Sequence, residues 1–346
     1  MTLDKLEEMM DTCHRCSLCK FIPALTIKSN RFSHICPSIE RYNFHSYSGG
    51  GRLIMANSIF KGRSEFTPEM LETLYRCTNC GGCEISCQWV YEITPNEVIH
   101  ELRVHAVESG HGPMPKHKKY IDMVEAKQNP YGEEPEKRPA WLPDDVNVDK
   151  DSSTLYFVGC TASYRREEIA TATSRVLNAS GVGFQLLGSD EMCCGSPVYR
   201  VGDRKRAIEI MKSNLERFKA EGIERIITSC AGCYNMLAVE YPRYVDTRDI
   251  EVVHTSQLLE SLLAEGKIKL TKEVPMKVTY HDPCHLGRMA EPYEPWEGER
   301  MEVLTQVYMW DPPNPKRQGV QGVYDAPRNV LKQIPGVELK EMERIR

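Results

Sequence analysis

The stretch CTNCGGCEISC, residues 77–87, carries four cysteines separated by steps of three, three and four residues. A similar run, CHRCSLC, occupies residues 13–19, and Cys36 follows later, directly before Pro37. The sulfurs of a CxxCxxC run converge on one face of a cubane iron–sulfur cluster, and in two-cluster ferredoxins the fourth ligand of each cluster comes from the other run. The sequence therefore predicts two [4Fe-4S] cubanes. We expect the first to be held by Cys13, Cys16, Cys19 and Cys87, and the second by Cys77, Cys80, Cys83 and Cys36.

Structural zinc and disulfide bonds are the competing explanations for these cysteines. Zinc sites use two separated CxxC or CxxH pairs that close a tetrahedron, and the third cysteine of each run has no place in such a site. Disulfides need an oxidising compartment, whereas the start MTLDKLEEMMDTC has neither the basic stretch nor the apolar segment of a secretory signal. One departure from a compact ferredoxin is that sixteen residues separate Cys19 from Cys36. We expect this insertion, which carries Phe32, His34 and Ile35, to loop out between ligands.

Composition places the chain among soluble globular proteins of two or three domains, since it has 346 residues of which 41% are hydrophobic. No apolar run approaches the ~20 residues that a membrane-spanning helix requires, so we expect no transmembrane segment. A net charge of −5 argues against a nucleic-acid partner. Fourteen cysteines without a signal peptide indicate a reducing cytoplasm, and so many thiol ligands favour a cell protected from oxygen.

The N-terminal part, residues 1–127, is predicted to be a helical ferredoxin-like domain that holds the two cubanes. Within it, Thr67 followed by Pro68 is typical of a helix start, with the threonine as N-cap and the proline in the first turn. The stretch SGGG at residues 48–51 is interpreted as a loop, because no GK[ST] follows it and no clear strand precedes it.

Residues 128–153 are rich in proline, glutamate and aspartate and show little periodicity, which predicts a linker between domains. We expect Trp141 and Leu142 to pin this linker to a surface.

From residue 154 to residue 346 the pattern changes to strands that alternate with helices, which predicts an α/β domain with a mostly parallel sheet. Residues 291–323 contain five prolines and are predicted to be an insertion. The expected strands cover 154–158, 182–187, 223–228, 251–253 and 276–280, and the expected helices cover 165–179, 203–220 and 256–264.

An internal half-repeat is visible in this domain. The order strand, Cys160, helix and Gly181-Val182 returns as strand, Cys284, helix and Gly336-Val337. Aligning the two glycine–valine pairs would put a second Cys-Cys pair at about residue 348, beyond Arg346. We therefore expect either that the natural protein continues further or that the second half lacks its cluster.

A second constellation of cysteines lies in the first half of this repeat. Thirty-two residues separate its first two members and thirty-five separate its third and fourth. Loops at the carboxyl ends of parallel strands meet at one edge of a sheet, so thiols far apart in sequence can meet there. Gly195 and Pro197 mark a turn rather than core packing. The five cysteines, each after a predicted strand or at a predicted helix start, are Cys160, Cys193, Cys194, Cys230 and Cys233.

These motifs, with the HDPCHLGR stretch at residues 281–288, resemble the cysteine-rich CCG-domain iron–sulfur proteins. That family includes the heterodisulfide reductase subunits of methanogens and iron–sulfur subunits of anaerobic glycerol-3-phosphate dehydrogenase and of glycolate and lactate oxidases. The resemblance implies that the five cysteines hold a third, noncubane [4Fe-4S] cluster. It spans nearly the whole chain, although Cys284 alone represents the second set of such cysteines.

The leading functional hypothesis is an oxidoreductase subunit that resembles heterodisulfide reductase. The two cubanes would form a wire to the third cluster, where thiol/disulfide redox takes place. We expect Cys160, Cys193 and Cys194 to be the catalytic edge nearest substrate. Arginines at 165, 166 and 200 could hold an anionic substrate, but charged helix residues are usually solvated, and we favour solvated positions for all three.

Two alternatives stay open. The chain could be a non-catalytic relay subunit for a flavoprotein dehydrogenase, a quinone-linked membrane partner or a benzoyl-CoA reductase-type complex. Alternatively, the C-terminal cysteines could hold zinc, although five thiols are one too many for a tetrahedral site. His281 and His285 flank Cys284, and we expect them to satisfy backbone groups rather than to bind metal.

The partners that the resemblance implies are other redox subunits, either flavin-containing or linked to a membrane cytochrome or quinone. The expected location is the cytoplasm, with attachment to the membrane face only through such a partner.

Overall fold

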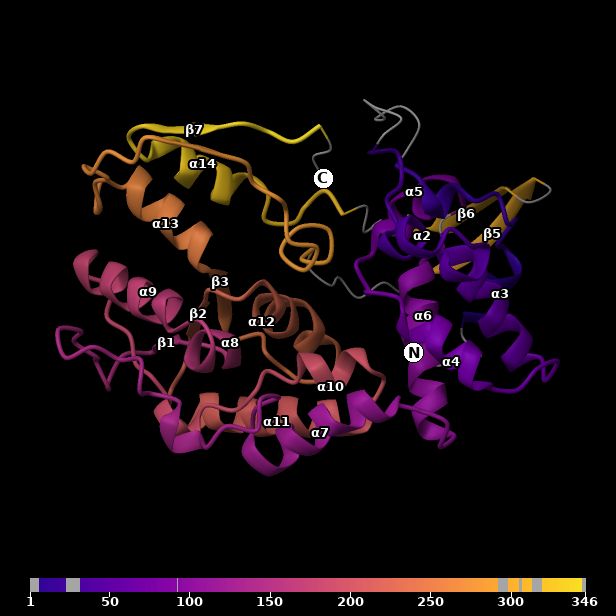
Figure 1. The fold of residues 1–346 in the computed structure, drawn as a ribbon, viewed down its shortest axis with the longest axis horizontal. Helices are drawn as coiled ribbons and strands as arrows, with labels where there is room; N and C mark the ends of the chain where they lie inside the picture. The colour runs from indigo at the N-terminus through magenta and orange to yellow at the C-terminus, as the bar shows by residue number, and fades with distance from the viewer. Residues whose placement is uncertain are drawn as a thin grey trace.

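The computed structural model of this chain describes residues 6–22, 32–91, 93–291, 298–304, 307–312 and 319–343. Most of the predicted insertion between Cys19 and Cys36 and parts of the predicted insertion at 291–323 lie outside these residues. Figure 1 shows two lobes, of which the N-terminal one is helical and the C-terminal one contains the parallel sheet. The predicted fold class is thereby confirmed.

The N-terminal lobe is a set of short helices packed around a small apolar core. Leu53, Leu74 and Ile99 are fully buried there, and they come from three different helices. Two of the predicted cluster ligands, Cys19 and Cys87, belong to the same buried core. The helices are α1 (Glu7–Asp11), α2 (Pro37–Tyr42), α3 (Gly49–Phe60), α4 (Pro68–Tyr75), α5 (Gly82–Tyr91) and α6 (Pro95–Glu108).

Two predicted helix boundaries in this lobe have opposite outcomes. Helix α4 begins as expected, because the Thr67 hydroxyl accepts a hydrogen bond from the Met70 N–H and Pro68 occupies the first turn. The expectation of a loop at 48–51 is wrong, since α3 begins at Gly49. The Ser48 hydroxyl accepts from the Gly51 N–H and caps the helix. Tertiary contacts override the low helix propensity of three consecutive glycines.

Helix α7 (Pro115–Lys127) and the segment after it pack against the C-terminal lobe. Ile121 and Val124 of α7 join the same buried cluster as Met211 and Phe218. In the predicted linker, Trp141 is buried and its ring lies edge-on to Tyr156 at 6.1 Å between centroids. The expected attachment of this segment is confirmed, and it covers the C-terminal lobe closely rather than spanning a gap.

The main sheet has the strand order β1-β2-β3, and both pairs are parallel. The strands are β1 (Thr154–Tyr156), β2 (Arg225–Thr228) and β3 (Glu251–His254). Leu155 lies opposite Ile226, which in turn lies opposite Val252. Each strand is followed directly by a helix, as a parallel sheet requires. The accompanying helices are α8 (Cys160–Tyr164), α9 (Glu167–Ala179), α10 (Ser196–Arg200), α11 (Arg204–Ala220), α12 (Ala231–Asn235) and α13 (Thr255–Ala264).

Residues 182–187, which the sequence predicts to be a strand, form only a single bridge between Gln185 and Leu155. The Gln185 backbone bonds to Tyr156 and Thr154, while its side-chain amide turns away to the backbone oxygens of Ser152 and Glu221. Gly188, with φ of 59°, then begins a short 3-10 turn. The apolar pattern correctly indicated a buried segment, but its pairing with β1 is too short for a strand.

Helices cover both faces of this sheet (Figure 1). On one face, Tyr156 and Ile227 pack with Leu177 of α9 and Leu262 of α13. On the other face, Leu155 and Ile226 pack with α10, α11 and α7. Because successive side chains of each short strand point to opposite faces, the sheet contributes to two separate apolar layers.

The last part of the chain forms a smaller unit beside α13. Strand β4 (Met276–Val278) pairs in parallel with β7 (Val337–Leu339), and α14 (Asp325–Gln333) packs on α13. Within the predicted insertion, β5 (Glu299–Leu304) and β6 (Val307–Asp311) form an antiparallel pair. Among the described helices, none is both long and apolar enough to cross a bilayer.

Candidate iron–sulfur sites

The first predicted ligand set gathers at the N-terminal end of α3. Cys13, Cys16, Cys19 and Cys87 line one small pocket together with Gly50 and Leu53. The Gly50 N–H donates to the Cys19 sulfur at 3.2 Å. A Cβ on Gly50 would lie 3.5 Å from the sulfur of Cys19 and 3.6 Å from that of Cys13. The positive end of α3 therefore faces sulfurs that carry negative charge when they bind iron.

Exposure differs within this set. Cys19 and Cys87 are buried, whereas Cys16 is exposed and contacts the Tyr91 hydroxyl. Burial raises the pKa of the Cys87 thiol well above its ordinary value, and the neighbouring Cys19 and Cys13 raise it further. Burial also raises the pKa of Cys13. Such thiols ionise when a metal binds them, so the set fits an iron–sulfur group that supplies the compensating charge.

The second predicted set lies on the other side of the same helix turn. A Cβ on Gly49 would lie only 2.8 Å from the Cβ of Cys83 and 3.2 Å from its sulfur. Burial and the charges of Cys77 and Cys80 raise the pKa of Cys83 far above its ordinary value. Cys36 lies close enough to Cys77 for that neighbour to raise its pKa as well, after the larger effect of burial. Cys87 thus lies beside the first run and Cys36 lies near Cys77 of the second, and the assignment of these thiols to two clusters stays a prediction.

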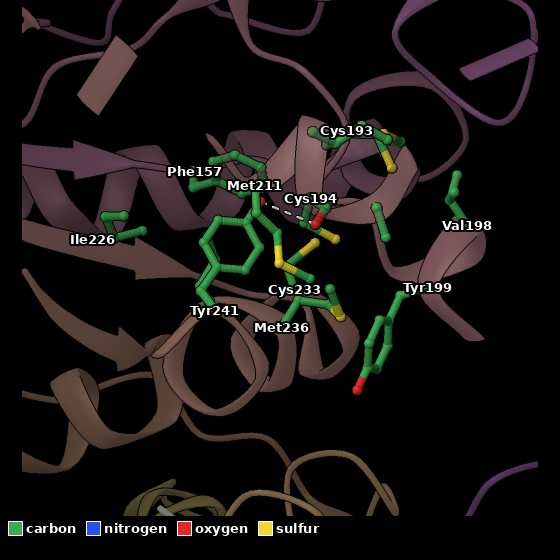
Figure 2. Close-up of a cluster of buried hydrophobic side chains, with 14 of the residues drawn as sticks. Phe157, Cys193, Cys194, Val198, Tyr199, Met211, Ile226, Cys233, Met236 and Tyr241 are labelled. Atoms are coloured by element: carbon green, nitrogen blue, oxygen red, sulfur yellow. Dashed lines mark hydrogen bonds between the residues drawn. The ribbon is translucent and has the colours of Figure 1, made fainter. Parts of the chain in front are cut away.

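The five cysteines of the third set meet at the carboxyl ends of β1 and β2 and at the turn before α10. Their thiols form a continuous series of hydrogen-bonded neighbours. Four of the five are buried, and Cys230 is half-buried. Figure 2 shows Cys193, Cys194 and Cys233 with Met211, Met236 and Tyr241 around them. The order of contacts is Cys160 to Cys193, Cys193 to Cys194, Cys194 to Cys233, and Cys233 to Cys230.

Local structure explains how the third set is held. Cys160 begins α8 after Gly159, whose φ of 77° turns the chain away from β1. Gly195, with φ of 85°, makes the turn between the Cys193-Cys194 pair and α10. Hydrogen bonds from Cys193 and Cys233 lower the pKa of Cys194 to about 5. Hydrogen bonding with Cys233 likewise lowers the pKa of Cys230, to about 6.

Among the described residues, no three His, Cys, Asp or Glu side chains surround one point closely enough to hold a single metal ion. The thiols of the third set lie side by side in a series instead.

Arg138 is a member of the third site that the sequence analysis missed. Its Nη1 and Nη2 lie 3.7 and 3.6 Å from the Cys160 sulfur. The same guanidinium forms an ion pair with Glu191 at 2.5 Å, and the two side chains are only 3% and 2% exposed. Glu191 also accepts the backbone N–H groups of Val158 and Gly159, both at 2.9 Å. The only signal in the sequence was the position of Arg138 three residues before Trp141.

The three arginines considered as substrate ligands lie in two different environments. Arg165 pairs with Glu133 and Arg166 with Glu168, and both arginine side chains are largely exposed, at 43% and 62%. Arg200 instead donates to Asn235 Oδ1 at 2.5 Å and to Ser196 Oγ at 3.1 Å, beneath the lobe junction. The expectation of solvated positions is confirmed for the first two and is wrong for Arg200.

The two lobes meet along buried polar side chains. Arg103 of α6 donates to the Cys77 carbonyl at 2.6 Å and to the Arg200 carbonyl at 2.8 Å. His100 bonds the Tyr199 carbonyl at 2.9 Å, and the Tyr199 hydroxyl donates to Glu240 at 2.9 Å. Continuous hydrogen bonding therefore joins Cys77, a predicted ligand of the second set, to the helix that follows Cys194.

The HDPCHLGR stretch lies against the N-terminal lobe. Cys284 is hydrogen-bonded to Cys80 through their thiols. His285 is hydrogen-bonded to the Asn79 backbone, as expected, and burial lowers its pKa to about 3.

A helical lobe with two ferredoxin-type thiol sets, joined to a sheet edge that gathers five more thiols, defines an iron–sulfur oxidoreductase of the cysteine-rich domain class. Two family models match within this frame: the 4Fe-4S dicluster domain over residues 9–89 and the Cysteine-rich domain over residues 154–238. The chain belongs to the family of heterodisulfide reductase subunits that the Methanosarcina proteins represent.

Three relatives illustrate the range of this similarity. The chain is 33% identical to a subunit of the dihydromethanophenazine:CoB--CoM heterodisulfide reductase of Methanosarcina acetivorans, over 97% of the chain and 76% of the relative. It is 30% identical to the EtfAB:quinone oxidoreductase of Syntrophomonas wolfei, over 97% of the chain and 46% of the relative. It is 32% identical to a subunit of the fumarate reductase (CoM/CoB) of Methanothermobacter marburgensis, over 79% of the chain and 47% of the relative. No solved structure matches significantly.

Proposed function

We propose that this chain carries electrons through two cubanes to a third cluster, where a disulfide and two thiols are interconverted within a multisubunit anaerobic complex. The proposed ligands are Cys13, Cys16, Cys19 and Cys87 for the first cubane, Cys36, Cys77, Cys80 and Cys83 for the second, and Cys160, Cys193, Cys194, Cys230 and Cys233 for a noncubane third cluster.

The observation that carries this proposal is the connection between the second and third thiol sets. Arg103 holds the Cys77 carbonyl on one side and the Arg200 carbonyl on the other. Arg200 ends α10, which begins two residues after Cys194. The path from a cubane ligand to the third set therefore runs through packed, hydrogen-bonded protein, which favours electron transfer between the two.

Disulfide chemistry explains why several clusters would share one chain. A disulfide needs two electrons, whereas each cubane carries one. When bound, the third cluster supplies iron that can hold a sulfur fragment between the two electron transfers. The contribution of Arg138 is to hold a permanent positive charge beside the Cys160 sulfur, and Glu191 fixes its orientation. We propose Cys160, Cys193 and Cys194 as the edge of the site nearest substrate.

A relay without disulfide chemistry is the second candidate. Four of the five thiols of the third set are buried, which suits a cluster that exchanges only electrons. The relatives also include a protein named as an EtfAB:quinone oxidoreductase. In that case the third cluster would pass electrons to a flavin-containing, cytochrome or quinone-linked partner.

Anaerobic iron analysis and a single-turnover reaction separate these possibilities. Three clusters of four irons predict about 12 irons per chain. A value of about 8 irons would mean that the third cluster is absent. Zinc in place of the missing iron would indicate that the C-terminal cysteines form a structural zinc site. The pre-reduced protein is then mixed with the mixed disulfide of coenzymes M and B. Release of both thiols, lost in a Cys194→Ser variant, supports the disulfide function. Reduction of a quinone without thiol release supports the relay.

The remaining assignments follow from this proposal. We place the protein in the cytoplasm, attached to a membrane only through a partner subunit. The dicluster domain comprises residues 1–127 by sequence, but the packing of α7 on the C-terminal core favours a boundary near residue 114, with 128–153 as part of the C-terminal unit.

A further inference from the structure

Cys284 is the one cysteine of the fourteen that the three clusters leave over. It lies in the second half of the internal repeat, yet its thiol is hydrogen-bonded to that of Cys80, a proposed ligand of the second cubane. The two residues are more than two hundred positions apart in sequence. Their meeting is therefore a product of the tertiary fold rather than of a local motif.

The segment that carries Cys284 is held by hydrogen bonds to two other parts of the chain. Asn235 Nδ2 donates to the Met289 carbonyl at 2.6 Å, and the Val323 N–H donates to the Leu286 carbonyl at 2.8 Å. Within the segment, the Met289 N–H bonds the Cys284 carbonyl at 3.0 Å. These bonds hold the backbone from Cys284 to Met289 and so fix the direction from which the Cys284 thiol approaches Cys80.

The glycines of the CGGC run make this approach possible. A Cβ on Gly81 would lie 2.3 Å from the Met289 sulfur, and a Cβ on Gly82 would lie 2.9 Å from Arg288 Nη1. Gly81 also has φ of 69°, which favours glycine. The two residues between Cys80 and Cys83 are thus the ones that allow the C-terminal segment to pack against this run.

The surroundings of the two thiols suit iron ligands. Cys80, Cys284 and Arg288 line one cavity together with His281 and Asp282. The Asp282 carboxylate is paired with Arg328 at 2.6 and 2.7 Å, so its negative charge is compensated. Arg288 adds positive charge near both sulfurs. The two sulfurs and a guanidinium therefore share one cavity beside the second thiol set.

We propose that Cys284 is a fifth thiol of the second cubane site and can replace Cys80 as its iron ligand. In the exchange, the iron–sulfur bond to Cys80 breaks and one to Cys284 forms. The proton of the Cys284 thiol passes to the departing Cys80 thiolate, and no electron is gained or lost. The C-terminal half of the chain would thus support a cluster that sequence spacing assigns to the N-terminal domain alone.

Five variants of the full chain, purified without air, test this exchange. With about 12 irons in the wild type, Cys80→Ala keeps about 12, because Cys284 takes the vacant position, whereas Cys80→Ala/Cys284→Ala keeps about 8. Cys284→Ala alone keeps about 12. Cys77→Ala is the matched control, and it should fall to about 8 irons whether or not Cys284 is present. Equal iron in Cys80→Ala and the double variant, at either level, overturns the proposal.

Alkylation of Cys284 gives a second readout that does not depend on iron counting. In the loaded wild type the Cys284 thiol is free and should react with iodoacetamide, whereas in Cys80→Ala it should be protected. Protection of Cys284 already in the wild type would place it in another ligand set and overturn the proposal. The paramagnetic signal of the first cubane reports whether the lobe is folded. Should Cys80→Ala fail to fold, the smaller change Cys80→Ser is judged by the same two measurements, with and without Cys284→Ala.

Discussion

At the scale of single residues, the Arg138–Glu191 pair shows how a buried charge is kept next to a thiol. Removing two ions from water is costly, and it is tolerated only where each ion finds good partners. Glu191 accepts two backbone N–H groups as well as the guanidinium, and the Arg138 guanidinium faces the Cys160 sulfur. The Tyr164 ring lies 5.6 Å from the guanidinium carbon and completes the enclosure.

Replacing Arg138 by glutamine should affect both stability and redox behaviour. The variant leaves Glu191 buried without its cation, so the free energy of unfolding of the C-terminal lobe should fall by about 3–5 kcal/mol. Loss of a positive charge beside Cys160 should also make the reduction potential of the third cluster more negative, as measured by a redox titration followed by paramagnetic resonance.

Two control variants separate charge from packing. Arg138→Lys keeps the charge and should shift the potential less than Arg138→Gln. Arg175→Gln removes an exposed pair with Asp145, at 54% and 61% exposure, and should change neither quantity measurably. An unchanged potential in Arg138→Gln would show that the guanidinium serves packing alone.

The buried histidine at the lobe junction predicts a loss of stability at low pH. Burial lowers the pKa of His100 from 6.5 to about 4, with Glu240 opposing the shift and Arg103 and Arg243 adding to it. As pH falls, the unfolded chain takes up this proton first, so the stability is lost through 6.5 and down to 4. His100 should therefore account for about 1 kcal/mol of lost stability between pH 7 and pH 5.5.

Denaturant unfolding of His100→Gln at both pH values checks this prediction. The free energy of unfolding of the wild type should fall by more than the contribution of His100 alone. Burial also lowers the pKa of His254 to about 4 and of His285 to about 3. The variant should lose about 1 kcal/mol less than the wild type. His105→Gln, at an exposed position of the same helix, is the control and should follow the wild type. The same loss in both variants would contradict the assignment.

At the scale of elements, the first turn of α3 lies against both predicted cubane sites. Gly49 adjoins Cys83 and Gly50 adjoins Cys19, and the two glycines have different amounts of space. A Cβ at Gly49 meets the Cys83 side chain at 2.8 Å, whereas one at Gly50 has its nearest contact at 3.5 Å. The substitutions Gly49→Ala and Gly50→Ala are therefore a matched pair.

Gly49→Ala should lose the second cubane and Gly50→Ala should keep both. We expect about 8 irons in the first variant and about 12 in the second, because the Gly50 N–H that bonds Cys19 is retained by alanine. Iron analysis with paramagnetic spectra of the two variants tests this. Retention of the full iron content by Gly49→Ala would show that the ligand run can shift by a few tenths of an ångström without loss.

How much of this architecture the sequence predicts depends on whether the cause is local. The Thr67-Pro68 cap and the alternating strands and helices follow from contacts within a few residues, and the structure bears them out. The helical state of residues 48–51 does not, because three glycines form a helix only where neighbouring sulfurs and the Ser48 cap favour it. The single bridge at Gln185 likewise depends on contacts with distant backbone groups.

At the scale of the whole molecule, Arg103 is the central contact between the lobes. It reaches carbonyl groups on both sides, and the Gly202 backbone packs directly on the Arg103 backbone. Arg103→Met would leave these carbonyls buried without donors, each at a cost of about 1–3 kcal/mol. We expect the two lobes of the variant to unfold at clearly different temperatures. In the wild type the unfolding temperatures of the two lobes should lie closer together.

Calorimetry under nitrogen measures this separation. Arg206→Gln is the control, because it removes a more exposed ion pair with Glu125 at 2.6 Å. It should shift the transitions slightly without separating them. Identical profiles for Arg103→Met and the wild type would indicate that α7, rather than Arg103, couples the lobes.

In the candidate sites, too, the sequence predicts the residues placed by local spacing and misses those brought in by long-range contacts. Spacing within each cysteine run indicated which thiols share a neighbourhood, and the carboxyl ends of parallel strands indicated where the third set would meet. Arg138 contacts Cys160 from 22 residues away in the sequence. Cys284 contacts Cys80 from 204 residues away. A single sequence carries no periodic or spacing signal for contacts of that kind.

The exposure of Cys16 has a consequence for where electrons could enter or leave the molecule. Cys19 and Cys87 are buried and Cys13 is half-buried, so a cluster held by this set would come nearest to the surrounding water at Cys16. Under the proposed function, a docking protein that hands over or collects an electron would approach there, beside the stacked rings of His14 and Tyr91. Damage by air would begin at that same corner and leave the interior sites intact for longer.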